Sequence, residues 1–327
     1  MLLAKKNILF IAPKFFGYEN SIRKELEKRQ ANVHIIYENL EDYSLFYRLM
    51  LRLIKPYRGL FMLLYYKYKL RKVLTSIDIL FVIRGHSLPK EIVEILKSEN
   101  PNCICIMYQW DSVKNNPNAL NIKDHFNKVY SFDMVDSLKY GWVYRPLFFR
   151  SQGIIPYENR KYDIAFICSL HSKRFYIYKQ LLEMKKKGLK VFLYLYSSYY
   201  SYLIGKYIKR DPLFREVKTK DITFFKMKES KISEIYLNSR IIVDYTHPNQ
   251  NGYTIRTIES LGNSCKLITN NKKILGADFY SPKNIMLYTD KICLDNVFVR
   301  EGYQNVPPEL ISNYSLESWI DFIFDEK

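Results

Sequence analysis

The stretch from residue 241 to residue 271 carries residue types that bind phosphorylated ligands. Its sequence, IIVDYTHPNQNGYTIRTIESLGNSCKLITNN, predicts a strand ending at Asp244, a polar loop, and a helix closed by Gly262 at a C-cap position. A helix N-terminus offers unpaired N–H groups to a phosphate, and Arg256 can add a bidentate contact. Glu259 can accept hydrogen bonds from a ribose diol. The alternative is an ordinary helix on which Arg256 and Glu259 form a surface salt bridge.

A basic loop follows the first predicted strand of the second half of the chain. It reads SLHSKR and supplies His171, Lys173 and Arg174 just before a predicted helix. Cations at a helix N-terminus are electrostatically unfavourable unless an anion lies near them. A bound phosphate would supply that anion, whereas the alternative is a solvated basic start to the helix.

Three segments of the first half place polar residues at the ends of predicted strands. In KFFGYE, Gly17 lies where the backbone must turn sharply after the first strand. Asp111 in QWDS can act as a general base toward a hydroxyl, and His86 in RGHS is its rival. A helix N-cap is the alternative role for Asp111, Ser87 and Ser112.

Short apolar runs alternate with helical patterns, which predicts βαβ units and mostly parallel sheets. The predicted strands are Asn7–Ala12, Val33–Tyr37, Ile79–Ile83, Cys103–Tyr108, Val129–Phe132, Asp163–Cys168, Lys190–Tyr196, Ile222–Phe225, Ile241–Tyr245, Lys266–Thr269 and Ile285–Tyr288. The predicted helices are Glu19–Arg29, one or two within Tyr43–Leu74, Pro89–Ser98, Lys173–Lys187, Glu229–Asn238, Tyr253–Leu261 and Leu316–Phe324.

The length of 327 residues suits two domains, which we expect at residues 1–150 and 151–327. The fold class is therefore α/β, with two Rossmann-like domains facing across a cleft. Ligands of such folds bind beyond the carboxyl ends of the strands, where the polar segments above lie.

Composition narrows the class of protein further. An excess of 51 Lys and Arg over 33 Asp and Glu gives a net charge of +18, which predicts a negatively charged partner or surface. The five cysteines form no CxxC pair, so a zinc site and a disulfide framework are not expected, and a reducing cytoplasm fits. No apolar run is long enough for a membrane-spanning helix.

The chain resembles GT-B glycosyltransferases, and within them bacterial transferases of lipopolysaccharide and capsule assembly related to CgeB-like proteins (glycosyl transferases group 1). The segments that carry the resemblance are YQWDS, YSFDMVD, RPLFF, YDIAFICSLHSKR and HPNQNGYTIRTIESLG, in this order. The resemblance implies a GT-B fold, with a nucleotide-diphosphate sugar bound by the second domain and an acceptor by the first.

The resemblance also implies roles for individual residues. Glu259 would hold the ribose of the donor. The first glutamate of the family's usual pair falls at Asn251 or Gly252 here, so Gln250 or Asn251 would take over its role toward the sugar hydroxyls. The residues assigned to donor binding are Gly17, His171, Lys173, Arg174, His247, Gln250, Asn251, Gly252, Thr254, Arg256 and Glu259.

No metal or other cofactor is expected. The sequence has no Asp-x-Asp pair, no HExxH, no Walker-type glycine loop and no clustered histidines and cysteines. The charge of the leaving nucleotide diphosphate would be met by Arg174, Arg256 and helix N–H groups. An inverting reaction would use Asp111 or His86 as base, and a retaining one would need no protein base.

The segment from Tyr43 to Ile77 predicts a basic amphipathic insert, with eight Lys or Arg and no acidic residue in 35 positions. Such helices lie on anionic membrane surfaces. The alternatives are a core-facing helix with a solvated basic side and a nucleic-acid surface. Tyr199–Arg210 has a similar composition and can extend the patch.

We therefore expect a glycosyltransferase that is peripheral on the cytoplasmic face of a bacterial membrane. Its partners would be a nucleotide-diphosphate sugar, a lipopolysaccharide or capsular glycan acceptor that can be lipid-linked, and the anionic membrane surface, with no nucleic acid. The alternatives are a nucleotide-sugar epimerase or hydrolase of the same fold and a basic nucleic-acid-binding protein.

Overall fold

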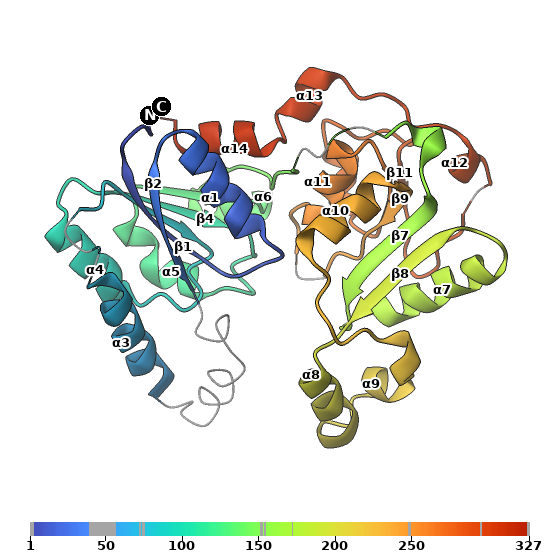
Figure 1. Cartoon of the computed structure of the whole chain (residues 1–327), viewed down its shortest axis with the longest axis horizontal. Helices are drawn as coiled ribbons and strands as arrows, with labels where there is room; N and C mark the ends of the chain where they lie inside the picture. The colour runs from blue at the N-terminus through green and yellow to red at the C-terminus, as the bar shows by residue number, and fades with distance from the viewer. Residues whose placement is uncertain are drawn as a thin grey trace. The chain divides into compact units, whose positions relative to one another are not determined.

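A computed structural model describes residues 3–38, 57–71, 73, 76–150, 153, 155–171, 173–247, 250–294 and 296–325. The chain divides into two compact units (Figure 1). Unit 1 comprises Met1–Leu147, Asn249–Gly252 and Leu316–Lys327, and unit 2 comprises Phe148–Pro248 and Tyr253–Ser315. Of the basic insert expected at 43–77, residues 43–56, 72, 74 and 75 lie outside the described residues, as does Pro248 of the expected donor loop.

Unit 1 is built on a six-stranded sheet in the order β2-β1-β3-β4-β5-β6, in which every pairing is parallel. The apolar run ILFVI makes β3 buried at every position, as expected for a central strand covered on both faces. The strands are β1 (Asn7–Ala12), β2 (Asn32–Tyr37), β3 (Ile79–Ile83), β4 (Ile104–Gln109), β5 (Lys128–Ser131) and β6 (Val143–Tyr144). The helices are α1 (Tyr18–Lys28), α3 (Arg58–Leu70), α4 (Lys90–Glu99), α5 (Asn118–Ile122) and α6 (Met134–Tyr140).

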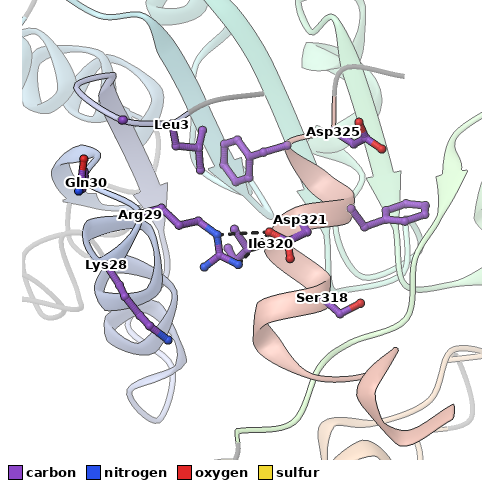
Figure 2. Close-up of a pocket in the computed structure, with 11 residues that line it drawn as sticks. Leu3, Lys28, Arg29, Gln30, Ser318, Ile320, Asp321 and Asp325 are labelled. Carbon is purple, nitrogen blue, oxygen red and sulfur yellow. Dashed lines mark hydrogen bonds and ion pairs between the residues drawn. The ribbon is translucent and has the colours of Figure 1, made fainter. Parts of the chain in front are cut away.

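The C-terminal helix α14 (Leu316–Ile323) packs in unit 1. Its Trp319 is fully buried, with its ring centroid 4.7 Å from that of Tyr108 on β4. Asp321 accepts a hydrogen bond from Arg29, just after α1, beside a pocket of about 710 Å³ (Figure 2). The first domain was expected to end at residue 150, and the main segment of unit 1 ends three residues earlier, at Leu147. Residues 316–327 also belong to unit 1, because Trp319 packs in its core.

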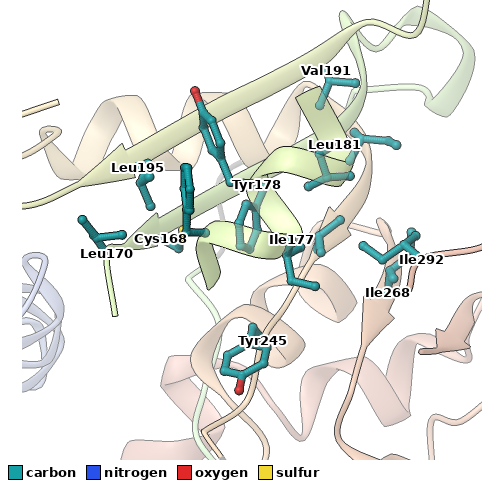
Figure 3. Close-up of a cluster of buried hydrophobic side chains, with 14 of the residues drawn as sticks. Cys168, Leu170, Ile177, Tyr178, Leu181, Val191, Leu195, Tyr245, Ile268 and Ile292 are labelled. Carbon is teal, nitrogen blue, oxygen red and sulfur yellow. The ribbon is translucent and has the colours of Figure 1, made fainter. Parts of the chain in front are cut away.

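Unit 2 contains a five-stranded sheet in the order β11-β10-β9-β7-β8, again with parallel pairings. Side chains of β7, β8 and α7 form its main apolar cluster (Figure 3). The strands are β7 (Tyr162–Ser169), β8 (Val191–Tyr196), β9 (Ser239–Val243), β10 (Lys266–Thr269) and β11 (Ile285–Leu287). The helices are α7 (Arg174–Lys186), α8 (Tyr199–Leu203), η5 (Ile204–Ile208), α9 (Pro212–Glu216), α10 (Glu229–Leu237), α11 (Ile255–Gly262), α12 (Asn296–Arg300) and α13 (Pro308–Ser312).

Two local predictions were wrong. The strand expected at Ile222–Phe225 is reduced to one bridge between Thr223 and Tyr196, because the chain there leaves the edge strand β8. Gly262 is the last residue of α11 rather than its C-cap, which is Asn263. A Cβ at Gly262 would lie 2.1 Å from the ring of Phe149, so close packing explains the glycine.

The α/β class with two parallel sheets is confirmed. Within the part of the chain that the structure describes, no helix is long and apolar enough to cross a membrane.

Candidate functional site

Unit 2 gathers a cluster of cationic and titratable side chains at the carboxyl ends of two neighbouring strands. Strand β7 pairs with β9, so the segments that follow them leave the sheet side by side. His171 and Arg174 come after β7, Asp244 comes directly after β9, and Arg256 projects from the first turn of α11. This is the edge at which ligands bind in open parallel sheets.

Asp244 is the carboxylate at the centre of this cluster. It is fully buried, and its Oδ1 accepts a hydrogen bond of 2.7 Å from Nε of Arg256. Its Oδ2 accepts from the hydroxyls of Thr246 and Thr269, at 2.8 and 3.3 Å. Burial alone would lower the pKa of Arg256, but the Asp244 carboxylate outweighs burial and raises it, so the guanidinium stays charged.

Arg174 contributes a second guanidinium with fewer partners. One terminal nitrogen donates to the carbonyl of Tyr245 at 3.2 Å, and the other contacts Nε2 of His171. Its Nε is buried and has no hydrogen-bond partner among the residues that the structure describes. Burial and the neighbouring Arg256 lower the pKa of Arg174 to about 10.

The pKa of His171 is lowered by burial and by the same excess of positive charge. Burial, together with the charges of Arg174 and Arg256 and the proximity of His247, lowers its pKa to about 3. The imidazole is therefore neutral at physiological pH. Two arginines and a histidine thus meet one carboxylate, whose oxygens are already occupied, and an anion such as a phosphate would supply the missing negative charge.

The other basic and polar residues expected in the donor site lie elsewhere or have local roles. Lys173 forms an exposed ion pair with Asp290 at 3.2 Å and does not join the cluster. Thr254 caps α11, since its hydroxyl accepts from the backbone N–H of Thr257 at 3.3 Å. That hydrogen bond satisfies one of the orphan donors at the helix start.

Glu259 lies in a buried ion pair. Only 2% of its surface is exposed, and its carboxylate accepts from Nε of Arg150 and from Nδ2 of Asn263, both at 3.3 Å. Arg150 also pairs with Glu229. Arg256 and Glu259 therefore have separate partners, Asp244 and Arg150, rather than the surface salt bridge weighed above. The contact of Glu259 with a ribose stays a prediction.

Residues 250–252, expected in the donor site, are packed in unit 1. The N–H of Asn251 donates to Oδ2 of the buried Asp133 at 3.1 Å, and Gln250 precedes it, partly buried. A Cβ at Gly252 would lie 2.6 Å from the ring of Phe132, so this position has room for glycine alone. The roles of these residues toward a donor sugar stay predictions.

The carboxyl edge of the unit 1 sheet holds the other expected residues. Gly17 precedes α1 with a φ of 77°, the left-handed turn for which glycine is suited. Nδ1 of His86 lies 3.2 Å from Oδ1 of the buried Asn116. Asp111 is half-exposed, and one carboxylate oxygen lies 3.7 Å from a terminal nitrogen of Arg84.

None of the three candidate caps occupies an N-cap. Helix α4 has Pro89 at its N-cap and α5 has Pro117, so Ser87, Ser112 and Asp111 cap neither helix. The carboxylate of Asp111 is therefore not used as a cap of either helix, and it pairs with Arg84.

Sequence analysis missed Glu38 and Arg84 in unit 1 and Asp244 in unit 2. Arg84 follows β3 with a φ of 70°, an uncommon conformation for a residue with a side chain. Its Nε donates to Glu38 at 3.1 Å, and the N–H of Ser87 donates to the other oxygen of that carboxylate at 3.1 Å. Burial raises the pKa of Glu38 to about 7, although Arg84 opposes the shift. The signal was available, since Glu38 and Asp244 each directly follow a strand.

Comparisons with known proteins identify the fold. No family model and no curated protein matches the sequence. The structure of Alr3699/HepE from Anabaena in complex with UDP-glucose matches with a TM-score of 0.50 at 9% sequence identity, over 97% of this chain and 98% of that chain. Weaker matches are MurG of Acinetobacter baumannii (TM-score 0.46, 12% identity, 87% and 88% of the two chains) and a glycosyltransferase from Rickettsia africae (0.47, 12%, 99% and 100%). The GT-B fold expected from the sequence is confirmed.

Among the described residues, no group of three or more histidines, cysteines and acidic residues is placed to hold a metal ion. The expectation of metal-independent chemistry stays a prediction.

Replacing Glu259 with alanine should destabilise unit 2, because Arg150 would lose a partner inside the protein. Breaking a buried ion pair costs about 3 kcal/mol, and Glu229 offsets part of it. Urea unfolding measures the change. Glu234→Ala is the control, since Glu234 pairs with Lys231 on the exposed side of α10 and its loss should cost below about 0.5 kcal/mol. Equal, small losses in both variants would contradict a buried pair at Glu259.

Glu38 should make stability depend on pH near neutrality. Its pKa is about 7 in the folded chain against 4.5 for an ordinary glutamate, so the folded state binds the proton more tightly. The resulting stabilisation is complete below pH 4.5 and is lost as the pH rises through 7, by roughly 3 kcal/mol at most. Glu38→Gln should remove this loss, and superimposable unfolding profiles of the two proteins between pH 5 and 8 would contradict the assignment.

Proposed function

We propose that this chain is a glycosyltransferase that uses a nucleotide-diphosphate sugar. The diphosphate binds in unit 2 at His171, Arg174 and Arg256, and the acceptor binds at the carboxyl edge of the unit 1 sheet. The observation that carries the proposal is Nε of Arg174, which is buried near Arg256 and has no acceptor among the described residues.

The cationic cluster suits the charge that develops on the leaving group. When the glycosidic bond to the donor breaks, negative charge accumulates on the diphosphate oxygens. Arg174 has a donor with no partner in the described part of the chain, and Asp244 holds Arg256 through Nε, which leaves the terminal nitrogens of Arg256 for a ligand. These groups are positioned before the ligand arrives, so little reorganisation is needed during the reaction.

The acceptor hydroxyl needs a base if the reaction inverts the configuration at the sugar. Asp111 is the better placed candidate, since it is half-exposed, caps neither α4 nor α5, and lies beside Arg84. His86 is the rival, with Asn116 fixing one ring nitrogen. Transfer in which Asp111 or His86 takes the hydroxyl proton balances without a metal or other cofactor.

Two observations support a sugar-nucleotide donor and a glycan acceptor. The fold is shared with a protein whose structure was solved with UDP-glucose. The sequence resembles transferases of lipopolysaccharide and capsule assembly, which act on growing glycans. We place the reaction on the cytoplasmic face of a bacterial membrane, with a lipopolysaccharide or capsular glycan as acceptor.

Helix α3 supports attachment to an anionic membrane surface. Its inner face buries Met62, Tyr66 and Leu70 in the core of unit 1. Its outer face remains apolar, since Leu60 and Leu64 are 56% and 54% exposed. A helix with a merely solvated basic side would carry polar residues at these outer positions. Apolar residues on a basic helix are typical of helices that lie in a lipid interface.

Arg174→Ala should weaken binding of nucleoside diphosphates by about tenfold or more, because a charge-assisted hydrogen bond to an anion is lost. Calorimetry with UDP, ADP, GDP and CDP measures the change, after circular dichroism has shown that the variant is folded. Lys173→Ala is the matched control. It removes the adjacent cation, which pairs with Asp290, and should leave affinity unchanged. Equal losses in both variants, or none in either, would contradict the assigned site.

The double variant Leu60→Ser/Leu64→Ser should bind less to vesicles that contain phosphatidylglycerol, because two apolar contacts with the lipid interface are lost. Cosedimentation measures the bound fraction. The control is Val135→Ser/Leu138→Ser, which removes two exposed apolar residues from α6 of the same unit. Unchanged binding of the α3 variant would contradict lipid contact at this face.

A further inference from the structure

A second basic and apolar surface lies in unit 2, on a helical insertion that follows β8. The chain leaves this edge strand at Tyr196 and meets it again at Thr223, and α8, η5 and α9 fill the interval. Figure 1 shows α8 and α9 beyond the ends of β7 and β8, outside the layer of strands. The insertion adds no strand to the sheet, and its inner residues pack against the unit 2 core.

The inner side of the insertion is firmly packed. Tyr202 is buried, and its hydroxyl contacts the carbonyl of Val217 and the hydroxyl of Thr219. Gly205 faces the ring of Phe214 so closely that a Cβ would lie 2.5 Å from it. The position of residues 206–210 is therefore set by contacts with α9.

The backbone then turns residues 206–210 outward. Residues Ile204–Ile208 form a π-helical turn, in which the N–H of Lys209 donates to the carbonyl of Ile204 at 2.8 Å. The turn ends at Arg210 with a φ of 50°, where helices usually place glycine, and the N–H of Asp211 donates to Gly205 at 2.9 Å. Arg210 is strained in this conformation, because a residue with a side chain rarely adopts a positive φ.

The outer side combines large apolar side chains with the exposed cations Lys209 and Arg210. Tyr207 and Ile208 are adjacent, with exposed fractions of 65% and 74%. Nζ of Lys206 donates to the hydroxyl of Tyr202 at 2.8 Å and lies over the rings of Tyr202 and Tyr207. In the part of the chain that the structure describes, no acidic side chain pairs with Lys209 or Arg210. We call residues 206–210, of sequence KYIKR, the unit 2 knob.

Charge around the unit 2 knob points to an anionic partner. Residues 199–228 contain eight Lys or Arg and three acidic residues. Asp211 caps α9 through the N–H of Leu213, and Glu216 pairs with Lys179. Two of the three acidic side chains are thus engaged locally, whereas Lys209 and Arg210 of the unit 2 knob are exposed.

We propose that the unit 2 knob is a membrane contact site, which places Tyr207 and Ile208 in the interface of an anionic bilayer. Tyrosine suits the headgroup layer, an isoleucine reaches the acyl boundary, and flanking lysines and arginines pair with lipid phosphates. A nucleic acid would use the cations but gives Ile208 no apolar environment. The proposal does not depend on sugar transfer or on the contact of α3.

A fluorescent label at Ile208 tests insertion directly. Ile208→Cys in a Cys293→Ser background is labelled with an environment-sensitive nitrobenzoxadiazole dye, since Cys103, Cys105, Cys168 and Cys265 are buried. Vesicles of phosphatidylcholine with phosphatidylglycerol should shift the emission to the blue and increase it, and pure phosphatidylcholine should not. Leu275→Cys in the same background is the matched control, because Leu275 is also more than half exposed in unit 2 and should not respond.

Binding of variants gives a second readout. Tyr207→Ser/Ile208→Ser should weaken vesicle binding about fivefold or more, because the apolar part of the contact is lost. Lys209→Gln/Arg210→Gln should reduce the dependence on phosphatidylglycerol. Both variants should keep the thermal stability and the nucleotide affinity of the parent, so their effect is separable from a failure of the proposed activity.

Three results would overturn the proposal. The first is a label at residue 208 that stays in water when the chain is bound to vesicles. The second is vesicle binding that is unchanged in Tyr207→Ser/Ile208→Ser. The third is a label that responds to a single-stranded oligonucleotide or to a second copy of this chain, and not to lipid.

Discussion

The ion pair between Asp244 and Arg256 organises the candidate site of unit 2. The carboxylate is buried at the end of a central strand and holds three donors, one from α11, one from the following loop and one from β10. Without it, Arg256 would face Arg174 and His171 with no negative charge between them. With it, the cluster is stable as a folded structure yet keeps an excess of positive potential, which is the property that a phosphate site needs.

Unit 1 has a similar pairing of a buried acidic residue with an arginine. Glu38 is buried at the end of β2 and holds Arg84, whose guanidinium then reaches Asp111. In each unit an acidic residue at a strand end fixes an arginine, and that arginine sets the electrostatics of the neighbouring polar segment. The difference lies in the charge of the resulting group, which is a cationic cluster in unit 2 and a carboxylate in unit 1.

The high positive charge of the chain has two distinct locations on the described surface. Part of it lies at the carboxyl edge of the unit 2 sheet, where it suits a small anion. Another part lies with exposed apolar residues on α3 and on the unit 2 knob, where it suits an extended anionic surface. The same net charge therefore suits both proposed partners, a nucleotide-diphosphate ligand and a lipid surface, and the neighbouring apolar side chains distinguish the two.

The sequence by itself determined the elements whose signals are local. Runs such as ILFVI specify buried parallel strands, and helices with a regular apolar period were predicted to within about two residues. The polar residues after those strands were found for the same reason, because a parallel sheet brings its carboxyl ends to one edge. Glu38 and Asp244 obey that rule but were assigned no role, because their partners Arg84 and Arg256 meet them only in the folded chain.

Tertiary structure decided which partner each charged residue has. Arg150 is remote in sequence from Glu259, and α14 is remote from β4, so no local pattern could join them. The sequence around Gly262 predicts a helix end, yet the position requires glycine because the ring of Phe149 packs against it. Likewise, residues 250–252 pack in unit 1, where Asn251 donates to Asp133. These contacts depend on long-range packing, because the space and charge around each residue come from segments that are distant in the sequence.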